Sequence, residues 1–193
     1  ALELRAQEDL SLEQDLRRAL NENLLSVHYQ PIVDGRSGRP VSLEALVRWQ
    51  HPQQGFISPE RFVGLAEQHG FVAELDTWVA RRACADLVGL LEEGHDLRMA
   101  VNCSALNLSN PQMPAVVARI LERTGLEPAR LTVEVTENAL MNSLGAAIRT
   151  LDAVRELGVT LLRFWVLRHG VIPASRGGKI KTVLQTLALG LAI

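Results

Sequence analysis

The chain has 193 residues, a length that suits one domain, and its 47% apolar and 22% charged content is ordinary for a globular protein. Its net charge of -2 does not indicate a nucleic-acid polymer as a partner. No run approaches the roughly eighteen apolar residues that cross a bilayer, and the charged residues 1–9 do not resemble a signal peptide. We therefore expect a cytoplasmic chain with no membrane partner.

The N-terminal segment is expected to be an amphipathic helix, because leucines recur at near-helical spacing over residues 8–25. We interpret residues 1–25 as a linker helix. Two apolar-rich runs, Ser26–Val33 and Val41–Trp49, follow on either side of the turn-forming cluster 34–38. They predict two strands in a hairpin-like arrangement.

Helices and strands alternate after this hairpin. The predicted helices cover 59–68, 75–92, 110–124 and 143–157, and the predicted strands cover 97–103 and 130–135. This order predicts a parallel sheet built from βα units, either as an open doubly wound sheet or as a (β/α)8 barrel. Because a complete barrel usually takes about 250 residues, a barrel here is expected to be incomplete.

Three polar residues interrupt or end otherwise apolar strands. They are Glu44, Asn102 and Glu134. A buried carboxylate is costly unless it is paired or bound to a metal, and two carboxylates with an amide oxygen form a ligand set that suits Mg²⁺ or Mn²⁺. The residues also allow another interpretation, in which Glu44 pairs with a nearby arginine, Glu134 faces solvent and Asn102 caps the next helix.

Two further residues near the strand ends are candidates for ligand contact. Arg48, four residues after Glu44, has the planar donor group that binds phosphate, although a surface arginine is an equally simple interpretation. Gln30 could contact a base edge or a phosphate, but it also suits a turn. Cys84 and Cys103 lack metal or redox spacing and are expected to be small buried hydrophobic residues.

Six blocks together resemble, in order and spacing, the EAL domain of cyclic-di-GMP-specific phosphodiesterases. The blocks are Tyr29-Gln30-Pro31-Ile32-Val33, Glu44-Ala45-Leu46-Val47-Arg48-Trp49, His51-Pro52, Pro59-Glu60-Arg61-Phe62, Val101-Asn102-Cys103-Ser104 and Glu134-Val135-Thr136-Glu137. The resemblance extends from about residue 16 to residue 161 and implies an incomplete TIM-like (β/α) barrel with an antiparallel first strand. The EAL part of the chain is therefore expected at residues 26–161.

The resemblance also implies roles for individual residues. Glu44, Asn102 and Glu134 match the family's metal ligands, and the cofactor is expected to be Mg²⁺ or Mn²⁺. Arg48 matches a phosphate-binding arginine, and Leu46 and Gln30 match residues that contact cyclic-di-GMP. Glu137 matches a glutamate that braces an active-site loop. The implied reaction is metal-dependent hydrolysis of cyclic-di-GMP to pGpG. Family members often follow a GGDEF domain, so such a domain or a sensory domain is expected before this segment of the parent protein, and a homodimer is left open.

The pattern breaks after residue 161. The family continues with Asp-Asp-Phe-Gly-Thr-Gly, whereas this chain reads Leu162-Arg163-Phe164-Trp165-Val166-Leu167. All 22 acidic residues lie at or before Glu156, and both lysines of the chain lie in the segment 162–193. One hypothesis is a reading-frame shift, because CGA-TTT-TGG, one set of codons that encodes Arg163-Phe164-Trp165, contains GAT-TTT-GG, which begins Asp-Phe-Gly one base out of register. The segment 162–193 lacks the alternating βα pattern of the preceding residues, so it is expected to pack poorly or only partly to complete the sheet.

Three functions remain open on the sequence. The first is a phosphodiesterase, indicated by lineage, although the second half of its metal site has no counterpart in this sequence. The second is a degenerate module that binds cyclic-di-GMP or a partner without catalysis. The third is a decayed product without activity. Metal-dependent turnover distinguishes the first from the others, and dinucleotide binding distinguishes the second from the third.

Overall fold

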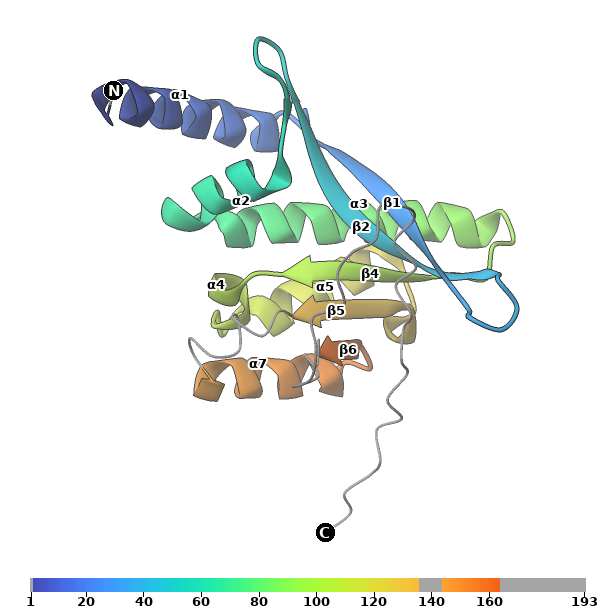
Figure 1. Cartoon of the computed structure of the whole chain (residues 1–193). Helices are drawn as coiled ribbons and strands as arrows, with labels where there is room; N and C mark the ends of the chain where they lie inside the picture. Colours follow the sequence, from blue (N-terminus) through green and yellow to red (C-terminus); the bar gives the residue numbers. More distant parts are fainter. Residues whose placement is uncertain (1, 136–143, 164–193) are drawn as a thin grey trace, which may run out of the picture.

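The computed structural model describes residues 2–135 and 144–163 of the chain (Figure 1). Helices and strands alternate after an N-terminal helix and a β-hairpin, as expected. In chain order the elements are α1 Leu2–Asn21, β1 Ser26–Val33, β2 Pro40–His51, β3 Gly55–Ile57, α2 Pro59–Gln68, α3 Val72–Glu92, β4 Arg98–Cys103, α4 Ala105–Leu108, α5 Met113–Thr124, η1 Pro128–Arg130, β5 Leu131–Val135, α7 Leu144–Glu156 and β6 Thr160–Arg163.

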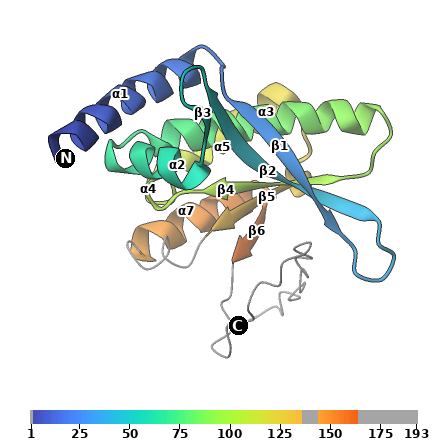
Figure 2. The ribbon, with the colours of Figure 1, turned by 45° about the horizontal axis from the view of Figure 1, so that its top comes forward.

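The sheet has the strand order β1-β2-β4-β5-β6, with β3 paired to β2 outside this path. Strand β1 is antiparallel to β2, whereas β2, β4, β5 and β6 run parallel to one another. This confirms the predicted α/β class and the antiparallel first strand. Among the residues that the structure describes, the sheet does not close on itself, so it forms part of a barrel (Figure 2).

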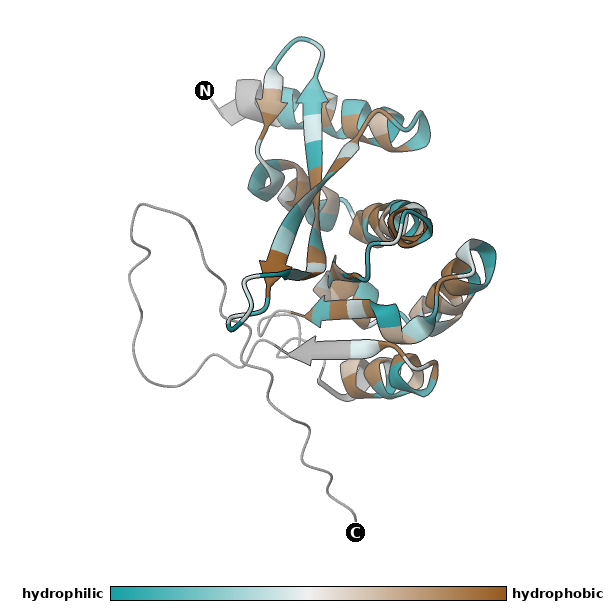
Figure 3. Ribbon diagram, turned by 90° about the vertical axis from the view of Figure 1, so that its right-hand side faces the viewer, coloured by the Kyte–Doolittle hydropathy of each residue, from teal (hydrophilic) through white to brown (hydrophobic). Residues whose placement is uncertain are grey.

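The hairpin between β1 and β2 turns at the predicted cluster, residues 34–38. The carboxylate oxygen Oδ1 of Asp34 accepts hydrogen bonds from the backbone N–H groups of Arg36 and Ser37 and from the Ser37 hydroxyl, at 3.1, 2.8 and 2.8 Å. Gly38 has φ +68°, which an L side chain rarely adopts. The strands of this hairpin carry both hydrophilic and hydrophobic bands (Figure 3).

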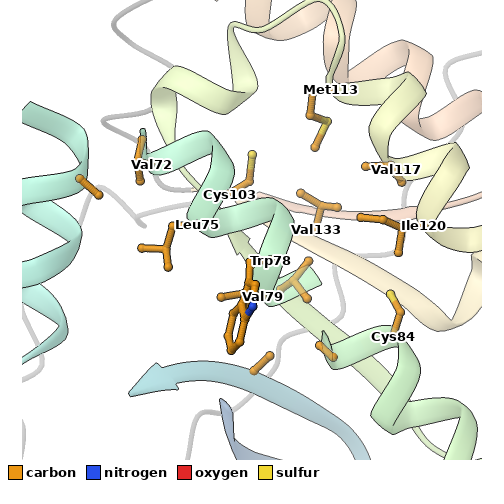
Figure 4. Packing of buried hydrophobic residues seen from close by; sticks show 14 of the residues in the cluster. Val72, Leu75, Trp78, Val79, Cys84, Cys103, Met113, Val117, Ile120 and Val133 are labelled. Atoms are coloured by element: carbon orange, nitrogen blue, oxygen red, sulfur yellow. The ribbon is translucent and has the colours of Figure 1, made fainter. Parts of the chain in front are cut away.

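A hydrophobic core lies between the sheet and the helices α3 and α5 (Figure 4). Strand residues such as Cys103 and Val133 pack there against helical residues that include Val79, Val117 and Ile120. Cys84, also in this core, is buried and free, and burial raises the pKa of its thiol to about 12. Cys103 is buried and free as well, so the prediction of two small buried hydrophobic residues is confirmed.

Helix α1 packs against the rest of the chain through an apolar stripe. Leu12 and Leu16 are fully buried, and the Arg17 guanidinium lies 4.0 Å from the centre of the Phe71 ring. The helix extends from Leu2 to Asn21, so it begins earlier and ends earlier than the predicted range 8–25. It ends early because Asn23 adopts a positive φ of 56°, and its side-chain oxygen accepts a hydrogen bond from Trp78 Nε1 at 2.9 Å.

Two other elements differ from the sequence-based expectation. The helix predicted at 110–124 begins only at Met113, and the separate four-residue helix α4 precedes it. The Asn110 side chain accepts a hydrogen bond from the N–H of Gln112 at 2.9 Å, a turn that separates the two helices. Short strand β3 was not predicted, since only three residues pair with the end of β2. Among the described residues, no helix combines the length and apolar character that a membrane span needs.

Candidate functional site

The predicted ligands meet on one face of the sheet because strand register places them there. Gln30 in β1 is the Cα partner of Glu44 in β2, and Glu44 is in turn the partner of Ala100 in β4. Asn102, two residues after Ala100, is the partner of Glu134 in β5. Directly paired residues face the same side of a sheet, as do residues two apart on one strand. Gln30, Glu44, Asn102 and Glu134 therefore share a face.

Leu46 and Arg48 follow Glu44 at the same period of two, so they lie on this face and nearer to the C-terminal end of β2. Both are half-buried. One guanidinium nitrogen of Arg48 donates to the backbone carbonyl of Val47 at 2.9 Å. A guanidinium carries five N–H groups in a planar fork, so this single bond leaves donors for an anionic ligand.

The two carboxylates are buried and an amide adjoins them. Glu44 and Glu134 are 6% and 4% exposed, whereas Asn102 is exposed. Asn102 Nδ2 donates to Glu44 Oε1 at 3.4 Å, which is a long hydrogen bond. This arrangement excludes part of the alternative interpretation from the sequence. Glu134 does not face solvent, and the cap of the next helix is Ser104 rather than Asn102.

Glu44, Asn102 and Glu134 lie on one face of the sheet at the rim formed by β2, β4 and β5. Their side-chain oxygens fit a hard divalent cation. Two carboxylates and an amide oxygen are the ligands that Mg²⁺ and Mn²⁺ prefer. Within residues 2–135 and 144–163, no three His, Cys, Asp or Glu side chains are grouped so that they could hold a metal ion, so a cation at this rim would need the amide of Asn102 as well as Glu44 and Glu134. A divalent cation held by only these three protein groups would also bind water or phosphate oxygens.

The far side of the rim is formed by β6. Leu162 is the Cα partner of Glu134 there, at the position where the sequence leaves the family's pattern. Leucine has no oxygen or nitrogen atom in its side chain, so the residue type at this position offers no side-chain ligand. Glu137, the predicted loop-bracing glutamate, lies outside the residues that the structure describes, as do residues 164–193 of the segment expected to pack poorly.

Strand β1, which holds Gln30, is fixed to helix α3 by the residue before Gln30. The Tyr29 hydroxyl donates to Asp86 Oδ2 at 2.6 Å, and Arg82 Nε also donates to this carboxylate at 2.9 Å. Burial, followed by the hydrogen bond to Asp86, raises the pKa of Tyr29. Because neighbouring residues on a strand point to opposite faces, this contact holds Tyr29 on the helical side and leaves Gln30 on the site side.

Sequence reasoning missed one polar network beside the site. The Asp76 carboxylate of α3 accepts hydrogen bonds from the turn that follows β4, and burial raises its pKa while bonds from Ser104 and Asn107 oppose the shift. Its place becomes distinctive only in the fold, where Asp76 lies on the same helical face as the buried residues Val72 and Val79. A lone carboxylate on an apolar helix face needs a partner.

A cavity of about 340 Å³ lies beside the end of β2, next to helix α1. Asp15 and Arg18 of α1 line it, together with Glu22 just after the helix and with Trp49 and His51 of β2. The buried His51 contacts Asp15 at 3.1 Å between Nε2 and Oδ2. This cavity therefore belongs to the contact between α1 and the strand that carries Glu44, Leu46 and Arg48.

The chain is therefore an α/β protein whose mostly parallel sheet forms part of a barrel. Two buried carboxylates and an amide lie on one face of this sheet. The sequence model described as EAL domain matches residues 13–162. This chain belongs to the EAL domain family. It is 48% identical over 159 residues to the cyclic di-GMP phosphodiesterase NbdA of Pseudomonas aeruginosa, a match that covers 82% of this chain and 20% of that protein.

Other relatives agree. The bifunctional diguanylate cyclase/cyclic di-GMP phosphodiesterase MucR of P. aeruginosa is 41% identical over 155 residues, covering 80% of this chain and 23% of that protein. The chain thus spans about a fifth of the length of these curated relatives. A solved structure described as a PaMucR phosphodiesterase, c-di-GMP complex, has a TM-score of 0.74 and 39% identity, covering 78% of this chain and 62% of that chain. The Xanthomonas citri FimX EAL domain in complex with c-diGMP has a TM-score of 0.74 and 26% identity, covering 82% and 62%.

Proposed function

We propose that this chain binds cyclic-di-GMP and one divalent cation, Mg²⁺ or Mn²⁺, at the rim formed by β2, β4 and β5, and that it hydrolyses the dinucleotide slowly if at all. The observation that carries this proposal is the shared face of Glu44, Asn102 and Glu134, in register, within a member of the EAL domain family. Relatives described as phosphodiesterases, and solved neighbours described as c-di-GMP complexes, support the choice of ligand.

The cation is assigned to three side chains. The carboxylates of Glu44 and Glu134 and the amide oxygen of Asn102 hold it. Their burial strengthens this interaction, because a charge is screened less in a low-dielectric surrounding than in water. The chemistry that such an ion supplies when bound is polarisation of a phosphate oxygen and a lower pKa of bound water.

The dinucleotide is assigned to the neighbouring positions on the same face. Arg48 donates from its planar guanidinium to a phosphate, where charge-assisted bonds are stronger than neutral ones. Gln30 hydrogen-bonds to a base edge or a phosphate, and Leu46 provides apolar contact to the dinucleotide. Binding therefore relies mainly on groups that this chain supplies.

Turnover needs more than these groups. Hydrolysis with two ions requires ligands on both of them, so that the attacking and leaving oxygens are stabilised together. Residues 162–167 hold no aspartate, and Leu162 is the register partner of Glu134. The part of the site that the family builds from paired aspartates has no counterpart at these positions. The chain therefore belongs to a lineage of phosphodiesterases but keeps the groups that bind cyclic-di-GMP rather than the full set that hydrolyses it.

Calorimetry of the 193-residue chain with cyclic-di-GMP, with and without Mn²⁺, tests this proposal alongside chromatography for pGpG. We expect binding that Mn²⁺ strengthens, and no pGpG. Glu44→Gln should abolish most of the effect of Mn²⁺ because it removes a charged ligand, while Glu122→Gln, at an exposed position of α5, should leave it unchanged. Absence of dinucleotide binding, or rapid hydrolysis that EDTA stops, would contradict the proposal.

A further inference from the structure

Asp76 joins helix α3 to the turn that follows strand β4. Its Oδ2 accepts the backbone N–H of Ser104 at 2.8 Å, the Ser104 hydroxyl at 2.6 Å and the Asn107 side-chain amide at 3.3 Å. Three donors thus converge on one carboxylate oxygen. Hydrogen bonds to an ionised acceptor are roughly twice as strong as neutral ones. The turn between β4 and α4 is therefore held by a side chain 28 residues away in sequence.

The same contacts set the direction of the chain after β4. Ser104 is the N-cap of α4, and its hydroxyl oxygen accepts the backbone N–H of Asn107 at 3.3 Å while its hydrogen points to Asp76. The hydroxyl is thus used as donor and acceptor at once, and it can rotate little. Asp76 consequently fixes the backbone at Ser104 and the side chain of Asn107 together.

Asn102 stands two residues before this anchored turn. Its Cα pairs with Glu134, and Cys103 pairs with Val135, so β5 holds the end of β4 from one side. Asp76 holds the residue that follows Cys103 from the helical side. Asp76 and Asn102 also line one cavity of about 30 Å³ together with core residues of α5, which places the carboxyl network next to the predicted ligand.

We propose that Asp76 is a positioning residue for Asn102: by holding Ser104 and Asn107 it sets the direction in which the Asn102 amide projects toward Glu44. This inference rests on the proposed function, in which Asn102 is a cation ligand. The bond from Asn102 to Glu44 is long, at 3.4 Å, so a weakly held amide depends on its backbone for its place. Partners behind a metal ligand commonly alter metal affinity by about 10–100-fold.

A matched control exists in the chain. Asp34 accepts two backbone N–H groups and a serine hydroxyl, much as Asp76 accepts one backbone N–H, a serine hydroxyl and an amide. It lies in the β1–β2 turn, at the opposite end of β2 from Arg48. Replacing Asp34 removes a similar network without touching the rim.

The test compares Asp76→Ala, Asp76→Asn and Asp34→Ala in the 193-residue chain. Mn²⁺ affinity is measured by electron paramagnetic resonance, and the Asn102 side-chain amide is followed by ¹⁵N NMR without metal. We expect Asp76→Ala to weaken Mn²⁺ binding about tenfold and to shift the Asn102 amide signals. Asp76→Asn should recover most of both, because its amide oxygen accepts the same bonds. Asp34→Ala should leave both unchanged.

The outcomes separate the two proposals. If Asp76→Ala lowers only the unfolding midpoint, with Mn²⁺ affinity and Asn102 signals as in the wild type, the residue is a structural anchor and the positioning inference is wrong. If the wild type binds neither Mn²⁺ nor cyclic-di-GMP, the proposed function fails, and the Asn102 signals alone decide the inference. If Asp76→Ala does not fold, Ser104→Ala, which removes one hydroxyl, must shift the same signals in the same direction for the inference to stand.

Discussion

At the scale of single residues, the contact between Asp15 and His51 has a defined protonation pattern. His51 Nδ1 accepts the backbone N–H groups of Gln53 and Gln54, at 3.2 and 3.1 Å, so in this arrangement Nδ1 holds no proton. The ring therefore donates to Asp15 from Nε2. The ring also meets Trp49 edge to face at 5.3 Å. One imidazole thus ties α1 to the strand that carries Glu44.

The pH dependence of stability should reveal this bond. The hydrogen bond from His51 is the main cause that holds the pKa of Asp15 below its usual value of 3.8. A carboxyl whose folded-state pKa is lowered stabilises the fold above its unfolded pKa, and that contribution is lost as pH falls through the folded-state pKa. We expect Asp15→Asn to lower the urea midpoint at pH 6, and its difference from the wild type to shrink below pH 3.8.

The control for this prediction is Asp152→Asn, at an exposed position of α7, which should shift the midpoint little at pH 6. A difference between Asp15→Asn and the wild type that stays constant from pH 6 to pH 3 would contradict the predicted role of the Asp15 charge. If the difference in urea midpoint between Asp15→Asn and the wild type grew as pH falls, the pKa of Asp15 would be raised in the folded state rather than lowered.

A single functional residue could be predicted from the sequence only where its type differs clearly from that of its neighbours. Glu44, Asn102 and Glu134 each stand in a short apolar strand, so their type differs from that of their neighbours. Asp76 was missed because α3 also carries Glu74, Arg81 and other charges, so one more acid is not distinctive. Only the fold shows that Asp76 faces the turn after β4. Asp76 stands out as an acidic residue among apolar neighbours only when the buried face of α3 is known.

At the scale of elements, α1 is held by its apolar stripe. Leu16 is fully buried, whereas Leu10 on the same helix is 53% exposed. Leu16→Ala should lower the unfolding free energy by about 2–5 kcal/mol, because it removes packed atoms and leaves a cavity. Leu10→Ala is the matched control and should change it by less than about 0.5 kcal/mol. Urea unfolding followed by circular dichroism measures both, and equal effects would show that α1 is not packed as described.

Element order was predictable and element ends were less so. The turn clusters and helical periodicities gave the hairpin, the parallel strands and most of the helices, because each signal is local. Helix α1 ends at Asn21 because of a distant contact, the hydrogen bond from Trp78 to Asn23, which no local pattern encodes. The three-residue strand β3 depends in the same way on pairing with β2.

At the scale of the whole molecule, the site is a product of register. Gln30, Glu44, Asn102 and Glu134 come from four strands, and a shift of one residue in any strand would turn its side chain to the helical face. The βα pattern of the sequence alone suggested polar residues at one rim of a parallel sheet, and the family resemblance supplied their roles as metal ligands. The buried residues on the opposite faces of these strands, such as Leu43 and Val101, hold that register.

The last prediction concerns what this rim requires for turnover. A chimera in which residues 162–193 are replaced by the Asp-Asp-Phe-Gly-Thr-Gly segment typical of the family, followed by the corresponding later residues of the NbdA relative, should hydrolyse cyclic-di-GMP to pGpG. The unaltered chain should be slower by a thousandfold or more, because an unassembled second ion site costs several kcal/mol of transition-state stabilisation and each 1.36 kcal/mol is about tenfold in rate. Chromatography of pGpG at saturating Mn²⁺ measures the difference.

Two controls make this comparison specific to the rim. Glu44→Ala in the chimera should abolish hydrolysis of cyclic-di-GMP. This result would show that the activity of the chimera depends on a ligand that comes from this chain. Dinucleotide binding should differ between the chimera and the unaltered chain by far less than turnover does, since Gln30, Leu46 and Arg48 are common to both. Hydrolysis by the unaltered chain that matches the chimera and disappears with Glu44→Ala would show instead that residues 1–161, with the present continuation, already assemble a working site.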